Sequence, residues 1–169
     1  YKEHRVIDLT CAKVKRVQKE IEKYAGHDYF VVVTGKKNHP ETKGLISYAD
    51  KGVVIEKKDD LEEFLSIGKE KLEKREYSKI FVISQTTGDK DLFALTISKL
   101  ENKLGNDFKI ASSNSICPQT DQKEKEAFAL QKKVEISFVV GDKLSSNAKK
   151  LYRILLNNGN EVYFIEDKK

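Results

Sequence analysis

The chain has 169 residues, of which 38% are hydrophobic and 35% charged, so it can bury a core and does not resemble a disordered protein. No apolar run approaches the roughly 18 residues that a membrane-spanning helix needs, and no signal-peptide pattern opens the sequence. The net charge of +5 comes from largely interleaved basic and acidic residues, which fits an anionic ligand without indicating nucleic acid. We therefore expect a cytoplasmic globular protein that binds neither a membrane nor nucleic acid.

Short runs rich in β-branched and aromatic residues predict strands along the whole chain. Several of these runs are continuously apolar, as is typical of strands buried on both faces of a parallel sheet. In chain order, the predicted strands cover residues 6–10, 29–34, 52–56, 79–84, 108–112, 134–140 and 161–166.

Amphipathic segments between these runs predict helices. The first repeats apolar residues at helical spacing over residues 14–24, and the second is a short helix that Asp59 can cap. Two further helices are predicted over residues 91–104 and 145–156, each with a glycine just beyond its end.

The alternation of strands and helices predicts an α/β fold built from right-handed βαβ units with parallel sheets. We interpret the polar stretch 112–122, which holds one of only two prolines, as a linker. This gives two small parallel-sheet α/β domains, residues 1–113 and 114–169. The sequence contains no methionine, so we expect it to be part of a longer protein.

Chemically active side chains follow the ends of most predicted strands. In parallel α/β sheets, ligands bind outside the carboxyl ends of the strands. We therefore expect these side chains to face one common cleft between the two domains. They are Cys11, His39, Glu41, Thr86, Thr87, Cys117, Ser145, Ser146 and Asn147.

Each of these groups has a functional and a purely structural interpretation. Ser145, Ser146 and Asn147 begin a predicted helix, where hydroxyls and free N–H groups can bind phosphate, or where a serine simply caps the helix. Cys11 and Cys117 are either ligands for a soft metal or small buried apolar residues. They lie far apart in the sequence, which argues against a structural disulfide.

The histidine, proline and glutamate of "TGKKNHPETKG" stand on what we interpret as a loop, at residues 34–44. His39 can donate to an anion and Glu41 can transfer a proton. Thr86 and Thr87 can hydrogen-bond a ligand hydroxyl or cap the following helix. Taken alone, a loop of this kind is more often a turn with solvated side chains.

Five motifs in register resemble one known family. The motifs are "DLTCAKVKRVQKEI", "GKKNHPETKG", "SQTT", "SICPQT" and "VVGDKLSSNAKKL". In this order and spacing they resemble 4-hydroxy-3-methylbut-2-enyl diphosphate reductase, the LytB/IspH family of the non-mevalonate isoprenoid pathway. Ala12 stands where the family often has proline.

The resemblance implies a trefoil of three α/β domains around an iron–sulfur cluster, a 4Fe-4S cluster in the complete protein, held by three cysteines. Cys11 and Cys117 would be two of its ligands. Glu41 would be the proton donor, and Thr86 would support it. His39, together with Ser145, Ser146 and Asn147, would bind the diphosphate. Ferredoxin or flavodoxin would supply the electrons.

The chain departs from the family pattern in one important respect. Only two cysteines are present, so the third cluster ligand is missing, and so is the first domain to which it belongs. The sequence matches the second and third domains only. We therefore expect residues 1–169 alone to fold without a cluster and without reductase activity.

Two other functions remain open at this point. Cys11, Cys117 and His39 are also zinc ligand types, so a zinc-dependent hydrolase is possible, although their wide spacing lacks the usual paired cysteines. A non-catalytic basic α/β module that binds RNA or a partner protein is the other alternative. The interleaved Glu and Lys residues speak against it, because such a module needs a basic face with aromatic residues.

Overall fold

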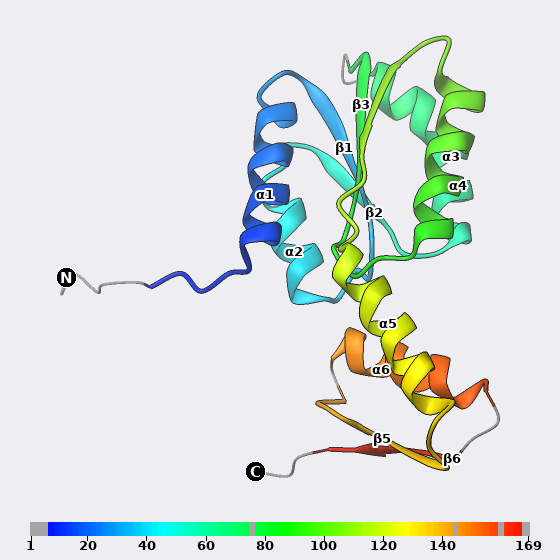
Figure 1. The fold of residues 1–169 in the computed structure, drawn as a ribbon. Coiled ribbons are helices and arrows are strands. Elements are labelled where there is room, and N and C mark those ends of the chain that lie inside the picture. The colour runs from blue at the N-terminus through cyan, green and yellow to red at the C-terminus, as the bar shows by residue number, and fades with distance from the viewer. Residues whose placement is uncertain (1–6, 75–76, 144, 159–160, 167–169) are drawn as a thin grey trace. The chain divides into compact units, whose positions relative to one another are not determined.

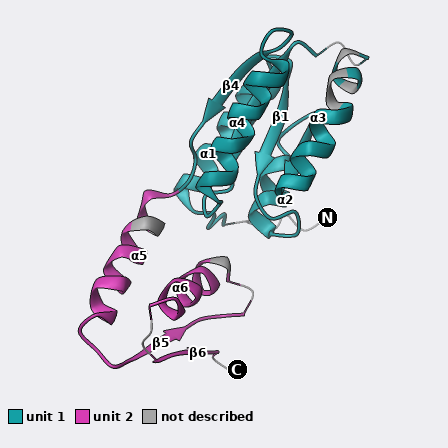
Figure 2. Cartoon of the chain, turned by 90° about the vertical axis from the view of Figure 1, so that its right-hand side faces the viewer, with its two compact units in different colours: residues 1–116 teal, residues 117–169 magenta. Residues whose placement is uncertain are grey.

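The computed structural model of the chain describes residues 7–74, 77–143, 145–158 and 161–166. Within its helices, it does not describe the side chains of residues 68, 69, 71, 73, 120, 121 and 146. The chain forms two compact units, residues 1–116 and residues 117–169, shown in different colours in Figure 2. Each is an α/β unit with a parallel sheet, as predicted.

Unit 1 alternates helices and strands from its start to its end (Figure 1). The elements are α1 (Ala12–Ala25), β1 (Tyr29–Thr34), α2 (Pro40–Ile46), β2 (Gly52–Ile55), α3 (Lys58–Glu73), β3 (Lys79–Ser84), α4 (Lys90–Leu104) and β4 (Lys109–Ser113). The four strands form one parallel sheet in the order β2-β1-β3-β4.

Helices cover both faces of this sheet (Figure 1). Because strand side chains alternate between faces, Val31 and Val33 of β1 pack with α1 and α2, whereas Phe30 and Val32 pack with α3 and α4. All four of these side chains are buried. The continuous apolar runs of β1 and β3 therefore reflect burial on both faces, and the site is built on a rigid central sheet.

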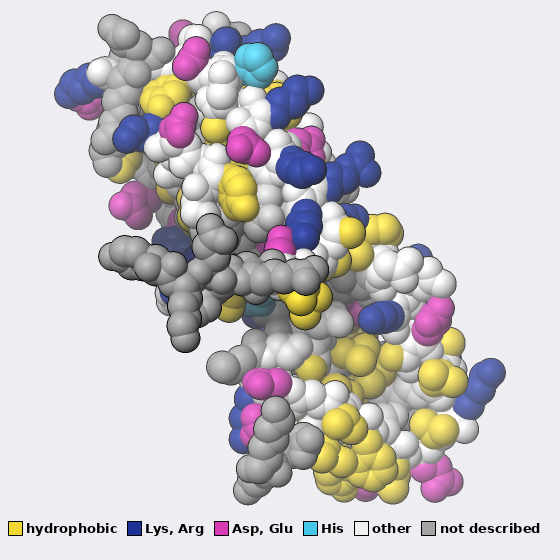
Figure 3. All heavy atoms as spheres, turned by 90° about the vertical axis from the view of Figure 1, so that its left-hand side faces the viewer, with side chains coloured by type: hydrophobic (Ala, Val, Ile, Leu, Met, Phe, Trp, Pro, Cys, Tyr) yellow, Lys and Arg dark blue, Asp and Glu magenta, His cyan; other side chains and the backbone are white. Residues whose placement is uncertain are grey.

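Unit 2 consists of α5 (Pro118–Gln131), β5 (Ile136–Val140), α6 (Ser146–Leu156) and β6 (Glu161–Ile165). Its two strands are parallel. Val139 and Val162 point toward α5 and α6 and are buried with Leu155. The other face of this sheet is exposed and apolar, and Figure 3 shows hydrophobic side chains gathered on the surface of unit 2. The exposed side chains are Ile136, Phe138, Val140, Tyr163 and Ile165.

Six of the predicted strands are present, and one prediction is wrong. Residues 7–10 of the predicted strand 6–10 have no regular structure, and residue 6 lies outside the described part of the chain. Leu9 is 89% exposed and Ile7 is 70% exposed. A strand needs a neighbour to satisfy its backbone, and no described strand pairs with this segment.

Two helices were missed, because each begins with a proline inside a polar stretch. The second half of the predicted loop 34–44 belongs to α2, while the predicted linker 112–122 includes the first turn of α5. Proline is well suited to the first helical position, where no N–H is needed. The units divide between Ile116 and Cys117 rather than near residue 113, because Ile116 is buried in the core of unit 1.

The start of α3 also differs from the prediction. Asp60, not Asp59, stabilises this end of the helix, because its Oδ2 accepts hydrogen bonds from the backbone N–H groups of Glu56 and Lys57 at 2.9 and 3.0 Å. The helix has 16 residues, so it is longer than the short helix expected. Among the described residues, no helix is both long enough and apolar enough to cross a membrane.

Candidate functional site

The His39–Pro40–Glu41 segment forms the start of a helix that follows β1. His39 is the N-cap of α2, and its Nδ1 accepts a hydrogen bond from the backbone N–H of Glu41 at 3.2 Å. Pro40 occupies the first helical position. The dipole at this helix start favours a negative charge. A histidine and a carboxylate are thereby fixed two residues apart at the carboxyl end of the sheet.

The Glu41 side chain reaches from α2 to the turn between β3 and α4. Its Oε1 accepts a hydrogen bond from the backbone N–H of Thr86 at 2.7 Å. Glu41 is half-buried and Thr86 is buried, so this contact is shielded from bulk water. The support for Glu41 that the resemblance assigned to Thr86 comes here from the backbone of Thr86 and not from its hydroxyl. One carboxylate oxygen is thus anchored and the other remains available.

Gln85 connects the two loops that carry His39, Glu41 and Thr86. It is 2% exposed, and its Oε1 accepts hydrogen bonds from the Lys36 backbone N–H at 3.1 Å and from the Thr42 hydroxyl at 3.2 Å. Its Nε2 donates to the Thr87 hydroxyl at 3.0 Å. The amide therefore uses both its donor and acceptor ends to hold the β1–α2 and β3–α4 connections together.

Gly35 allows this close approach. A Cβ atom at residue 35 would lie 2.8 Å from Cβ of Gln85 and 3.0 Å from the Thr42 hydroxyl. Real side chains do not approach backbone and buried neighbours so closely without displacement. A glycine directly after β1 is therefore needed for Gln85 to contact both loops.

Buried hydroxyls join the ends of β3 and β4. The Ser84 backbone N–H donates to the Ser115 hydroxyl at 3.0 Å, and that hydroxyl donates to the Ser84 carbonyl. Lys13 of α1 donates through Nζ to the Ile116 carbonyl at 3.1 Å. The start of α1, which follows Cys11, thus contacts the residue that precedes Cys117 in the sequence.

Cys11 lies at the start of α1, exposed, and forms no disulfide. The segment before it is held to the helix by Asp8, whose Oδ1 accepts from the Thr10 N–H at 2.9 Å and whose Oδ2 pairs with Lys15 at 2.8 Å. The hydrogen bonds from Lys15 and Thr10 hold the pKa of Asp8 well below its usual range. These contacts fix the backbone on both sides of the thiol.

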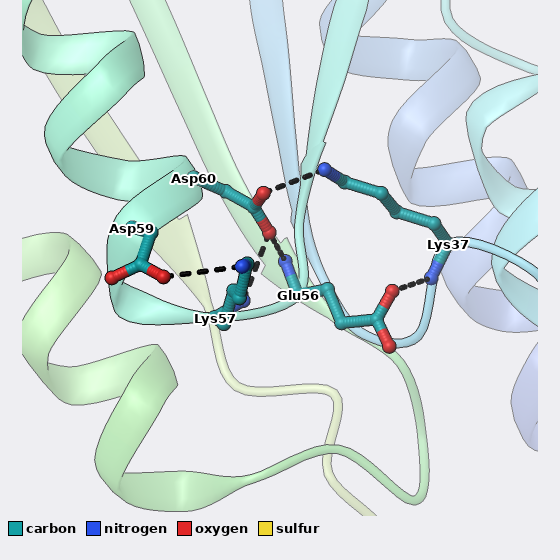
Figure 4. Close-up of polar contacts among 5 residues, drawn as sticks. All are labelled: Lys37, Glu56, Lys57, Asp59 and Asp60. Carbon is teal, nitrogen blue, oxygen red and sulfur yellow. Dashed lines mark hydrogen bonds and ion pairs between the residues drawn. The ribbon is translucent and has the colours of Figure 1, made fainter.

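A polar network braces the β1–α2 loop from its other side (Figure 4). Lys37 donates its backbone N–H to Glu56 Oε2 at 2.9 Å, and its Nζ pairs with Asp60 Oδ1 at 2.6 Å. Burial raises the pKa of Asp60, but the hydrogen bonds from Lys37, Glu56 and Lys57 outweigh it and hold the pKa below its usual value. The network ties the loop before His39 to the start of α3.

In unit 2, the Ser145–Ser146–Asn147 motif begins α6. Ser145 is the N-cap, and its hydroxyl accepts from the Ala148 backbone N–H at 3.3 Å. The structural interpretation of Ser145 is therefore correct. Asn147 is exposed, while the side chain of Ser146 lies outside the described part of the structure. The assignment of the Ser146 hydroxyl and the Asn147 amide to diphosphate binding therefore rests on the family resemblance alone.

The β5–α6 connection is held close to the end of β6. Lys143 donates its backbone N–H to Glu166 Oε1 at 3.2 Å, and its Nζ pairs with Glu166 Oε2 at 2.7 Å. This hydrogen bonding lowers the pKa of Glu166 and raises the pKa of Lys143. A Cβ at Gly141 would lie 2.7 Å from Cβ of Ala148, so glycine lets the first turn of α6 approach β5.

Cys117 is the N-cap of α5, partly exposed and not in a disulfide. Helix α5 leads into β5, and α6 leads from β5 back to β6, so both helices run opposite to the parallel strands. Both therefore begin on the side where the strands end. Cys117 and Ser145 share this side of unit 2, which is the side predicted from the sequence for a ligand site.

The structure brings together part of the predicted set. His39, Glu41 and Thr86 meet at the carboxyl ends of β1 and β3, and Cys11 lies at the same end of unit 1 because α1 runs opposite to β1 (Figure 1). The cleft shared by both units stays a prediction. Four polar residues that support this site were not predicted to do so, although each lies within a quoted motif. They are Gln85, Thr42, Ser84 and Ser115.

Fold and site together define a class: an α/β protein of parallel sheets with polar side chains, among them His39, Glu41 and Thr86, gathered where neighbouring strands end. Within this class, the chain belongs to the LytB family, because the family model described as "LytB protein" matches residues 1–169.

Curated relatives of this chain are named 4-hydroxy-3-methylbut-2-enyl diphosphate reductase. The Dictyoglomus thermophilum protein is 36% identical over 165 residues, a match that covers 97% of this chain and 53% of the relative. The Helicobacter pylori (strain Shi470) protein is 33% identical, and the match covers 96% of this chain and 55% of the relative. The chain thus spans about half the length of these relatives.

Two solved structures resemble the chain at 28% sequence identity. One, a 4-hydroxy-3-methylbut-2-enyl diphosphate reductase described as the terminal enzyme of the non-mevalonate pathway, superposes with a TM-score of 0.61 over 96% of this chain and 54% of its own. The Plasmodium falciparum reductase superposes with a TM-score of 0.70 over 94% of this chain and 48% of its own.

Proposed function

We propose that this chain supplies the second and third domains of a reductase that converts 4-hydroxy-3-methylbut-2-enyl diphosphate to isopentenyl and dimethylallyl diphosphate. The observation that carries the proposal is the Glu41 carboxylate, fixed at a helix start by the Thr86 backbone N–H at 2.7 Å. It lies within a family motif, and the family matches the whole chain.

Reductive dehydroxylation needs a proton donor beside the leaving hydroxyl, because hydroxide is a poor leaving group and water is a good one. Anchoring Oε1 to Thr86 aims the Glu41 carboxyl group and leaves Oε2 with no hydrogen-bond partner among the described residues. Oε2 is therefore the atom that would carry the proton to the hydroxyl. A positioned acid of this kind contributes about 10²–10⁴-fold to a rate.

The diphosphate would be bound by helix starts and by the side chains around them. His39 at the start of α2 and Ser145, Ser146 and Asn147 at the start of α6 are the residues we assign to this role. Free backbone N–H groups and the helix dipole both favour phosphate oxygens at such positions.

In the complete protein, Cys11 and Cys117 would hold an iron–sulfur cluster, which supplies electrons one at a time from ferredoxin or flavodoxin. Both thiols lie at helix starts and are free, which suits thiolate ligands. They do not complete the set, since the chain has only two cysteines. Reduced thiols also fit a cytoplasmic protein.

The zinc-hydrolase alternative gains no support from the geometry. Within either unit, the described residues contain no group of three His, Cys, Asp or Glu side chains that could hold a metal ion. The RNA-binding alternative has no observation in its favour.

The proposal is tested with the longer protein to which this chain belongs, purified without oxygen and supplied with a chemical reductant. Consumption of the allylic diphosphate with formation of both isoprenyl diphosphates supports it. A protein that carries its full complement of iron and sulfide and binds the diphosphate without reducing it would contradict it.

A further inference from the structure

A groove of about 610 Å³ runs along the outer edge of β2, which is an edge strand of the unit 1 sheet. One wall comes from α2, and the other comes from α3. The floor is β2 itself, with the side chain of Phe30 from the neighbouring strand. The wall and floor residues that matter here are Ile46, Gly52, Val53, Val54, Phe64 and Ile67.

The backbone of β2 presents free hydrogen-bonding groups to this groove. On its inner side, the carbonyl of Lys51 accepts from Val31 of β1, and the carbonyl of Ile55 accepts from Gly35, directly after β1, each at 3.0 Å. Because consecutive residues of a strand point their N–H and C=O groups to opposite sides, Gly52 and Val54 point theirs away from β1. No described residue bonds to these outward groups. An edge of this kind is a template for another strand.

Asp60 closes the edge at its far end. The next outward N–H after Val54 belongs to Glu56, and it donates to Asp60 Oδ2 at 2.9 Å (Figure 4). The free edge therefore consists of two residues, each with one donor and one acceptor. This short pattern restricts which strands can pair with it and in which register.

We propose that a second copy of this chain occupies the groove, with β2 pairing antiparallel to β2 of its partner about a two-fold axis at Val53. In this register Gly52 of each copy lies opposite Val54 of the other. The pair exchanges both N–H···O=C bonds, so every free group of the edge is satisfied. A register centred on Val54 would instead place Gly52 opposite Glu56, whose N–H is already used by Asp60.

The α3 wall is self-complementary under the same axis. Helix α3 runs opposite to β2, since it connects two parallel strands, and so the two copies of α3 would be antiparallel. Ile67, which is 40% exposed, and Phe64 would lie near the axis and cover their counterparts. The α3 wall thus offers an apolar centre that a second copy covers with the same residues.

Site-specific disulfide formation tests the register directly. In a Cys11→Ser, Cys117→Ser background, Val53→Cys places two thiols across the axis, where facing Cα atoms of such a pair are about 4.5 Å apart. With oxidised glutathione we expect a disulfide-linked dimer that forms at least about tenfold faster than with Ser98→Cys, an exposed control on α4 whose thiols meet only by collision.

Two variants then test whether the edge drives association in solution. Val54→Pro removes an outward N–H that β1 does not use, and Ile67→Lys places like charges at the axis. Each is expected to be monomeric by analytical ultracentrifugation at concentrations where the parent chain dimerises, with an unchanged circular dichroism spectrum. If Val54→Pro misfolds, Ile67→Lys decides.

The proposal fails under any of three results: a monomeric parent chain, equal crosslinking rates for Val53→Cys and Ser98→Cys, or an unchanged mass for Ile67→Lys. These readouts need no reductase activity, so they stand or fall separately from the proposed function.

Discussion

Residues far apart in the sequence create the chemistry of this site. Glu41 and Thr86 are separated by 45 positions, and Gln85 contacts Thr42 across 43. Each contact forms because β1 and β3 are neighbours in the sheet, so the loops that follow them end side by side. The hydrogen bond from the backbone N–H of Thr86 fixes the orientation of the Glu41 carboxylate, so no second side chain is needed to orient it.

Glu41→Gln in the complete protein tests the proton-donor role. The amide can still accept from the Thr86 N–H, so the fold and the diphosphate affinity should be retained, but it cannot deliver a proton. We expect turnover to fall by about 10²–10⁴-fold. The measurement is single-turnover reduction alongside the visible absorption spectrum, and normal turnover with an unchanged spectrum would remove Glu41 from the mechanism.

Gln85→Leu tests the connection between the two loops and can be made in this chain. The change leaves the Lys36 N–H and the Thr42 hydroxyl without their buried acceptor, at a cost of about 1–3 kcal/mol in the free energy of unfolding. Thr87→Ala is the matched comparison, since it removes only one of the contacts of Gln85. Urea denaturation should show a larger loss for Gln85→Leu; equal losses would refute the connecting role.

At the scale of elements, the sequence predicts the bounds of buried strands better than it predicts strand pairing or the helices between them. The bounds of β1 and β3 agree with the predicted runs at residues 29–34 and 79–84. Strands buried on both faces have continuously apolar sequences, which are easy to recognise. The run predicted as a strand at residues 6–10 is interrupted by Asp8 and has no described partner strand, and strand pairing is not encoded locally. Helix α5 was missed beyond its proline because it has no clear apolar stripe.

The site shows the same division between local and long-range information. Motif residues such as His39, Glu41 and Ser145 could be recognised from the sequence, together with their place at strand ends. Thr42 and Ser115 also lie in the quoted motifs, but their role could not be predicted, because it depends on contacts with Gln85 and Ser84 that only the fold creates. Ser145 is both the N-cap of α6 and a residue that the sequence predicts to bind the diphosphate.

The start of α3 should make the stability of unit 1 depend on pH. The pKa of Asp60 is lowered in the folded state, so its contribution is present above the unfolded value of about 3.9 and is lost as the pH falls through the folded value. Asp60→Ala should cost about 0.5–2 kcal/mol at pH 7, and the difference from the parent should shrink below pH 4.

Asp59→Ala is the control for this prediction. The Asp59 carboxylate is 82% exposed and pairs only with Lys57 among the described residues, so its loss should cost at most about 1 kcal/mol. Urea denaturation of both variants at pH 7 and pH 3 provides the comparison. A constant difference between Asp60→Ala and the parent across this range would contradict the assigned role.

At the scale of the whole molecule, the chain has an exposed apolar surface on unit 2. Unit 2 leaves one face of its sheet uncovered, with Phe138 62% and Val140 68% exposed. Phe138→Ser should therefore reduce the binding of a hydrophobic dye with little loss of stability, whereas Val139→Ser, on the buried face, should destabilise unit 2 by several kcal/mol. Dye fluorescence and thermal denaturation of the two variants distinguish the faces.

The chain by itself should carry no iron–sulfur cluster and no reductase activity. The cluster that the family resemblance implies is held by three cysteines, and this chain has two, each at a helix start of a different unit. Cys11 is exposed, so water and oxygen reach it directly, and iron held by too few thiolates is lost by hydrolysis and oxidation. Anaerobic reconstitution with iron and sulfide, followed by desalting and iron analysis, should return less than one cluster's content of bound iron. A stable, stoichiometric cluster that reduces the diphosphate would show that residues other than those assigned here complete the metal site.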